Sequence, residues 1–100
     1  MYIRWRVRYE WVELDKPRRC SLCRQPLSGR VVKRVFRGGR RFLCLDCAVE
    51  HLREDERYFA ILGQSRIYAP RELIVKAGLE ESGLLTSYET IKAVIRRLRG

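Results

Sequence analysis

The sequence predicts a small α+β protein with an N-terminal strand, a β-hairpin and a helix, followed by two C-terminal helices. Three observations support this class. Residues 2–12 alternate between apolar and charged side chains, the pattern of a strand with one buried face. Two strand-like runs, residues 31–36 and 40–43, flank Gly38-Gly39, which is typical of a hairpin. Later segments that begin near residues 47, 70 and 86 have apolar residues at helical spacing.

The chain length limits the architecture. One hundred residues make one domain with a modest core. We expect residues 1–63 to form a basic strand plus a finger-like unit, and residues 64–100 to form a helical extension that packs on it. No apolar segment follows the basic start, and no run approaches the roughly eighteen apolar residues of a membrane span. We therefore expect a cytoplasmic protein without a membrane partner.

The first strand presents two different faces. Residues two apart on a strand lie about 6.6–6.8 Å apart on the same face, so the odd and even positions separate. The charged face either lies in solvent over a packed core or follows a phosphate backbone, and both interpretations stay open. The apolar set is Ile3, Trp5, Val7, Tyr9 and Trp11, and the charged set is Arg4, Arg6, Arg8 and Glu10.

The four cysteines occur in two pairs, with two residues inside each pair and twenty between the pairs. A two-residue gap lets both thiolates of a pair face one ion, so this spacing predicts one structural Zn²⁺ in a tetrahedron of sulfurs. A small core gains folding free energy from such an ion. The alternatives are two disulfides, which are rare in the cytosol outside hyperthermophiles, and a redox pair, which belongs beside a βαβ pattern. The expected ligands are Cys20, Cys23, Cys44 and Cys47.

The predicted hairpin carries many cations. A turn centred on its two glycines places Val35 opposite Phe42 and Phe36 opposite Arg41. Like charges held together on a two-stranded ribbon repel, so the hairpin tip favours an anionic partner over a merely solvated loop. The cations of this segment are Arg30, Lys33, Arg34, Arg37, Arg40 and Arg41.

The first helix is expected to begin near Cys47 and to end at Gly63. Asp46 suits the N-cap because a short carboxylate accepts hydrogen bonds from the first turn. Glycine suits the end because it adopts the left-handed conformation without strain. The expected buried residues are Val49, Leu52, Phe59 and Leu62.

Two further helices are expected after it. Proline suits a first helical position, so a helix from about Pro70 to Ala77 is predicted, with Gly78 at its end. Thr86 and Glu89 have the spacing of a capping box, which predicts a last helix that runs to about Arg99.

A knuckle with the first cysteine pair, a hairpin, and a helix whose first turn carries the second pair together resemble the treble-clef zinc finger. The resemblance covers the chain from Cys20 to about Leu52, and it implies that the four cysteines are the zinc ligands. One position departs from the family: many such knuckles have glycine after the second cysteine, where the chain turns left-handed, and this chain has Arg24. The fold group includes ribosomal proteins, DNA-binding fingers, nucleases and protein-interaction modules, so it implies architecture more than function.

Positive charge concentrates in the first half of the chain. Residues 1–48 hold 13 basic and 4 acidic side chains, whereas residues 49–100 hold 9 and 8. The formal net charge is +10, and most of the cations are arginines, which form bidentate contacts with phosphate. Base composition or thermal adaptation also raises arginine content, but the clustering favours a polyanionic partner.

We expect a binding protein and no enzymatic activity. The sequence has no catalytic pair of carboxylates, no phosphate-loop motif and no nucleophile with a histidine partner. His51 is the only histidine, which disfavours a nuclease centre, and it is expected outside the ligand set. No small-molecule substrate is expected.

The most favoured function is that of a structural RNA-binding protein, ribosomal or ribosome-associated, with ribosomal proteins as further partners. RNA helices are contacted largely through shape and phosphates, which arginines can do without a base code. A DNA-binding regulator that reads the major groove with its last helix is one alternative, and a protein-interaction adaptor is another. Near the first knuckle, arginines either offset the charge of the zinc centre or contact phosphate. The candidate nucleic-acid contacts are Arg4, Arg6, Arg8, Arg18, Arg19, Arg30, Lys33, Arg34, Arg37, Arg40 and Arg41.

Overall fold

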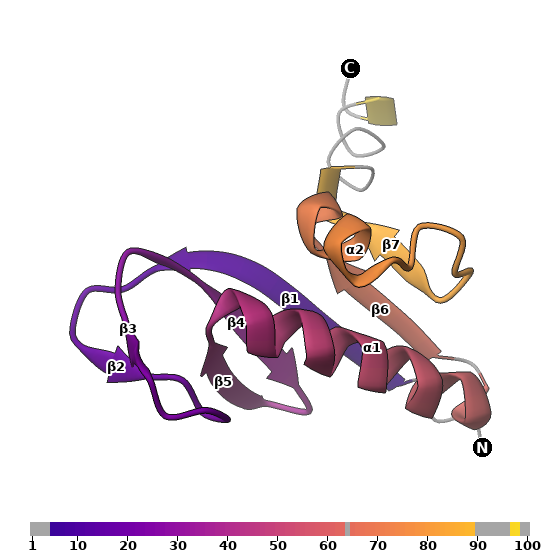
Figure 1. Cartoon of the computed structure of the whole chain (residues 1–100). Helices are drawn as coiled ribbons and strands as arrows, with labels where there is room; N and C mark the ends of the chain where they lie inside the picture. Colours follow the sequence, from indigo (N-terminus) through magenta and orange to yellow (C-terminus); the bar gives the residue numbers. More distant parts are fainter. Residues whose placement is uncertain (1–4, 64, 90–96, 99–100) are drawn as a thin grey trace.

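The computed structural model describes residues 5–63, 65–89 and 97–98. Over these residues the chain is a small mixed α+β protein with one larger sheet, one small sheet and two helices (Figure 1). The larger sheet contains β1 (Trp5–Glu13), β4 (Arg30–Phe36), β5 (Gly39–Leu43), β6 (Ser65–Ala69) and β7 (Leu85–Ser87). The small sheet contains β2 (Arg18–Arg19) and β3 (Pro26–Leu27), and the helices are α1 (Leu45–Leu62) and α2 (Arg71–Ala77).

The strands of the larger sheet lie in the order β5-β4-β1-β6-β7. Strand β4 is antiparallel to both of its neighbours, whereas β6 runs parallel to β1 and to β7. Parallel neighbours need a crossover, and α2 supplies it between β6 and β7. Helix α1 lies across the sheet and contacts α2, while β2 and β3 lie at one end (Figure 1). The segment predicted as a helical extension therefore also adds two strands to the sheet of β1.

The core lies between the helices and one face of the sheet. The strand prediction for residues 2–12 is confirmed over its described part, because the odd positions Val7 and Tyr9 are fully buried and Arg6 and Arg8 are exposed. We call the helix-covered side the inner face and the opposite side the outer face. The other main core residues are Val32, Leu43, Leu52, Phe59, Ile67, Ala69, Leu73 and Ala77.

The hairpin between β4 and β5 turns one residue earlier than predicted. Its central residues are Arg37 and Gly38, with φ values of 53° and 81°, as a primed two-residue turn requires. The predicted pairs were therefore wrong: Phe36 lies opposite Gly39, and Val35 lies opposite Arg40. The reason is packing, because the observed register places Leu43 beside Val32, and both side chains are fully buried. In the predicted register, Leu43 would have faced a charged residue.

Helix α1 begins two residues earlier than predicted. Its N-cap is Cys44, in an extended conformation, so Asp46 lies in the first turn and the N-cap prediction was wrong. The end at Gly63 is confirmed, with a φ of 65°. Leu52 and Phe59 are buried as predicted, but Leu62 is 38% exposed because it lies in the last turn, beyond the edge of the core.

The second helix begins one residue later than predicted, with Pro70 as its N-cap. The predicted last helix is wrong at its start, whereas residues 88–89 and 97–98 are helical as predicted. Helix α2 ends at Gly78, whose left-handed backbone lets its N–H donate to the carbonyls of the last turn. Thr86 lies in β7 opposite Tyr68, so it is not a helix cap: pairing with β6 satisfies its backbone instead. Most of the predicted last helix lies outside the described residues. None of the described helices is long and apolar enough to cross a membrane.

Candidate metal centre and the surrounding basic surface

The fold brings the four cysteines together. Cys20 and Cys23 lie in the loop between β2 and β3, Cys44 lies where β5 meets α1, and Cys47 lies in the first turn of that helix. All four Sγ atoms lie within 4.8 Å of one another, and those of Cys23 and Cys44 are 3.8 Å apart. A tetrahedral site with Zn–S bonds of about 2.3 Å has sulfurs about 3.8 Å apart, whereas a disulfide requires about 2.05 Å. The cluster can hold one metal ion, and its spacing does not fit disulfides.

Backbone hydrogen bonds hold the loop that carries the first pair. The N–H of Arg24 donates to the carbonyl of Cys20 at 3.0 Å, and the N–H of Cys20 donates to the carbonyl of Gln25 at 2.9 Å. Arg24 has a φ of 66°, so the chain turns left-handed at this position although the residue is not glycine. The N–H of Ser21 donates to the carbonyl of Phe42 at 2.9 Å and thereby attaches this loop to β5.

The environment favours ionisation of one thiol in particular. Burial raises the pKa of Cys20, but the backbone N–H groups of Cys23, Cys44 and Leu22 outweigh burial and lower this pKa to about 6. Burial raises the pKa of both Cys44 and Cys47. Thiols must lose their protons to bind a metal, so a cation in the cluster would supply the charge that the other sulfurs need.

A group of arginines lies beside the cysteine cluster. Together with Ser21 and Phe42, they line a shallow hollow next to the knuckle. The guanidinium of Arg18 stacks over the Phe42 ring at 4.2 Å, and Nη1 of Arg19 donates to the carbonyl of Arg24 at 3.0 Å. These cations can offset the charge of a metal–thiolate centre, and they are also accessible to phosphate. The arginines of the hollow are Arg18, Arg19, Arg24 and Arg40.

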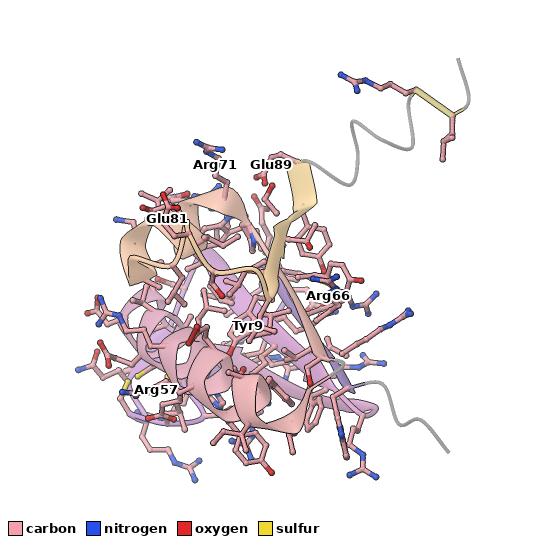
Figure 2. All side chains as sticks on the ribbon, turned by 90° about the vertical axis from the view of Figure 1, so that its right-hand side faces the viewer. Tyr9, Arg57, Arg66, Arg71, Glu81 and Glu89 are labelled. Carbon is pink, nitrogen blue, oxygen red and sulfur yellow. The ribbon has the colours of Figure 1, made fainter. Side chains whose placement is uncertain are left out.

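A second set of cations lies on the outer face of the sheet. Strand pairing places their side chains on this face, because Arg6 pairs with Arg66 and the even positions of β1 point away from the helices. Figure 2 shows Arg66 on the far side of the sheet from α1, whereas Arg57 lies on the helix side. Glu10 forms ion pairs with Arg8 at 3.3 Å and with Lys33 at 3.9 Å, which partly neutralises the set. The outer-face cations are Arg6, Arg8, Lys33, Arg40 and Arg66.

Arg34 was wrongly predicted as a nucleic-acid contact. Its side chain is 10% exposed, and its Nε and Nη2 donate to the two carboxylate oxygens of Asp55 at 2.9 and 3.0 Å. Arg34 lies on the inner face of β4, so the core and α1 separate it from any phosphate. The pair is structural.

The remaining predicted cations are divided between several places. Arg30 stacks over the Trp11 ring at 4.1 Å and lies 3.4 Å from the Glu72 carboxylate, which puts it on the helix side. Arg37 stacks over the Trp5 ring at 4.8 Å at the hairpin turn. Arg41 is exposed on β5, opposite the buried Arg34, and Arg4 lies outside the described residues. The structure therefore gathers four of the eleven predicted contacts on the outer face, namely Arg6, Arg8, Lys33 and Arg40.

Two groups of residues were not predicted from the sequence. Arg66 and Tyr68 belong to the outer face, but β6 is so short that only the alternation of residues 65–69 could have indicated it. The buried Tyr9 hydroxyl donates to Asp55 and lies 3.3 Å from Nδ1 of His51 (Figure 2 shows Tyr9 at the centre of the molecule). Because His51 belongs to this group, it lies apart from the cysteine cluster.

The buried group has a clear electrostatic preference. Burial alone would raise the pKa of Asp55, but hydrogen bonds from His51, Arg34 and Tyr9 outweigh burial and lower it. Burial, and next the Asp55 charge, raise the pKa of the Tyr9 hydroxyl. The group is thus a carboxylate paired with a guanidinium and a neutral phenol.

Comparison with protein-family models, with curated proteins and with solved structures found no match, so inferences about function depend on the geometry of the cysteine cluster and the basic surface.

Proposed function

We propose that this protein is a zinc-dependent nucleic-acid-binding protein built as a treble-clef zinc finger. The order of its parts supports the architecture: a knuckle with two cysteines, a hairpin, and a helix whose N-terminus carries the other two. The sulfur spacing supports zinc, which favours four thiolates in a tetrahedron. In this role the ion fixes the hairpin and the knuckle relative to α1.

The observation that carries the binding function is the concentration of positive charge on the outer face of the sheet. The outer face has cations on strands β1, β4, β5 and β6, with Glu10 as the acidic residue among the described members. Helix α1, on the other side, contains the exposed acids Glu50 and Glu54. The helix side also exposes Arg30, Arg41 and Arg57, but the cations of the outer face lie on neighbouring strands, which favours its contact with a polyanion.

The shape of the basic surface favours RNA over DNA. Sequence-specific DNA readers usually insert a helix or a β-ribbon into the major groove, and both α1 and α2 are packed against the sheet. A broad sheet face with arginines can contact phosphates and 2′-hydroxyls without entering a groove. The acidic side of α1 would then face protein neighbours, which fits a structural, ribosome-associated and cytoplasmic protein better than an enzyme.

A protein-interaction adaptor is a second candidate because of one exposed apolar patch. Tyr58, Ile61 and Leu62 lie at the end of α1 and are 59%, 84% and 38% exposed. Exposed apolar clusters often mark protein contacts. An RNA-binding protein that also contacts a protein would have such a patch too. A measurement of RNA binding therefore separates the RNA-binding function from that of an adaptor.

The test is the binding of structured RNA as a function of salt concentration. We expect the logarithm of the association constant to fall linearly with the logarithm of the salt concentration. Arg6→Gln combined with Arg8→Gln should reduce the slope, by about 0.7–0.9 for each phosphate that the protein no longer neutralises. Arg57→Gln, an exposed arginine on the helix side, is the matched control and should leave binding unchanged. Equal effects of the two substitutions, or no RNA binding at low salt, would refute the proposal.

A further inference from the structure

We propose that the outer face binds an unpaired nucleotide, with its base against an aromatic side chain and its phosphates on the surrounding arginines. The inference rests on the proposed nucleic-acid function and specifies single-stranded nucleic acid as its ligand. A hollow of about 550 Å³ on this face has the size of a small-ligand site, which typically measures about 300–1,000 Å³. The residues that line it are Arg6, Arg8, Val35, Arg37, Tyr68 and Tyr88.

The chemistry of the hollow suits a nucleotide. Tyr68, Tyr88 and Val35 provide ring and aliphatic surface, and both tyrosines are half-buried, so their positions are partly set before binding. Aromatic rings stack on any base, because every base has a π face. Burial, and next the charge of Glu10, raise the pKa of Tyr88 to about 12, so its hydroxyl stays neutral near a phosphate.

The arginines around the rings are available to an anion. Arg6 has no ion pair with any described residue, and Arg37 contacts the face of the Trp5 ring without an acidic partner in the described part of the chain. Arg8 shares Glu10 with Lys33, which leaves the hollow with a surplus of positive charge. Guanidinium groups next to exposed rings are the combination found in single-strand binding surfaces.

A second hollow continues the first along the sheet. Its volume is about 520 Å³, and it shares Arg6 and Tyr68 with the first hollow, so these two side chains lie between the hollows. Arg66 adds a cation at its far side, and Trp5, which belongs to the inner-face set of β1, borders it. A chain of successive nucleotides can therefore cross from β4 towards β6 with one base on each side of Tyr68.

An unsatisfied polar atom supports a ligand in the first hollow. Over the described residues, two buried side-chain oxygens lack a hydrogen-bond partner, namely Ser65 Oγ and Tyr88 Oη. Tyr88 lines the first hollow, whereas Ser65, which pairs with Trp5, lies on the inner face of the sheet. Buried polar groups without partners are rare in folded proteins, and a base or ribose that enters the first hollow can offer Tyr88 Oη the missing partner after a small shift of the side chain.

The experiment compares single strands with a duplex on the full-length, zinc-loaded protein. The probes are a short labelled oligouridine, an oligothymidine of equal length and an RNA duplex of equal length, all at one salt concentration. Tyr68→Ala should weaken oligouridine binding about tenfold, the usual effect of removing one stacking partner, and should leave duplex binding unchanged. Tyr68→Phe keeps the ring and should bind as the wild type does.

The outcomes separate this inference from the proposed function. Three results would refute the nucleotide site: Tyr68→Ala weakens binding of oligouridine and of the duplex equally, Tyr68→Ala leaves oligouridine binding intact, or Tyr68→Phe weakens oligouridine binding as much as Tyr68→Ala does. In each case, duplex binding by the wild type would still support the proposed function. If the wild type binds none of the probes, both are refuted. If Tyr68→Ala weakens binding of oligouridine but not of oligothymidine, the site is specific for RNA. If it weakens binding of both equally, the site accepts single-stranded RNA and DNA alike.

Discussion

The buried pair of Arg34 and Asp55 allows a quantitative prediction. Their side chains are 10% and 7% exposed, and two hydrogen bonds of 2.9 and 3.0 Å join them. Asp55→Ala leaves a guanidinium in the core without its counter-ion and removes the acceptor of the Tyr9 hydroxyl. Removing one partner of a buried ion pair typically costs about 3–5 kcal/mol. A domain of this size has about 5–15 kcal/mol in total, so the variant should be close to unfolding.

The matched control is an exposed pair on the same sheet. Arg8 and Glu10 are 54% and 28% exposed and lie 3.3 Å apart, so Glu10→Gln should change the free energy of unfolding by less than about 1 kcal/mol. The assay is denaturant unfolding at neutral pH with excess zinc, which keeps the metal contribution constant. Replacing both buried partners, with Arg34→Met and Asp55→Leu, should be less damaging than Asp55→Ala alone, because no buried charge is left unpaired.

Similar losses of stability in Asp55→Ala and Glu10→Gln would contradict a cost from an unpaired buried charge. A double substitution as damaging as Asp55→Ala would contradict it too, since the cost would then come from poorer packing. A double-mutant cycle on the two buried positions provides this comparison directly.

Proton binding, the metal and the knuckle turn offer further tests. The pKa of Asp55 is lowered in the folded state, so its charge stabilises the fold fully above the unfolded pKa of about 4, and this stabilisation is lost as pH falls through the folded pKa. The difference in the free energy of unfolding between wild type and Asp55→Asn should therefore shrink only in acid. The pKa of Tyr9 is raised in the folded state, so above about pH 10 the unfolded chain loses this proton first. The free energy of unfolding of the wild type should therefore fall above about pH 10 relative to that of Tyr9→Phe. Elemental analysis should find about one zinc per chain, and a chelator or Cys20→Ser should abolish the folded circular-dichroism signal; retention of structure without metal would contradict a structural role. Arg24→Gly should stabilise the zinc-loaded protein by up to about 1 kcal/mol by relieving a φ of 66°, whereas Arg24→Ala, which removes the guanidinium but keeps the Cβ, should not.

Local patterns predicted the parts of the fold that local physics determines. The strict alternation of residues 5–11 identified β1 and its buried face, and the cysteine spacing predicted the cluster. The start of α1 was less predictable than its end, because Cys44 rather than Asp46 caps it, without a side-chain hydrogen bond. The C-terminal strands depend on long-range pairing with β1, and five or three residues carry too little pattern to predict this.

The site was predicted by residue type more reliably than by location. Arginine content indicated a basic surface, but it did not distinguish Arg34, which lies in the core, from Arg8, which is exposed. A signal for the buried pair was present: Arg34 shares its strand face with Val32, and Asp55 lies three residues after the buried Leu52 on the apolar side of α1. Two opposite charges at buried positions predict each other, because neither is stable in a core alone.

The position of β5 at one end of the sheet has a consequence for self-association. A strand edge offers its free backbone N–H and C=O groups to any second strand, including one from another copy, and over the described part of the chain only the Phe42 carbonyl on this edge of β5 is occupied, by the N–H of Ser21. Here that edge consists of five residues, of which Arg40 and Arg41 are charged, so two copies meeting there would bring like charges together. The same positive residues that attract an anion thus also oppose aggregation through this edge, and neutralising them should reduce solubility.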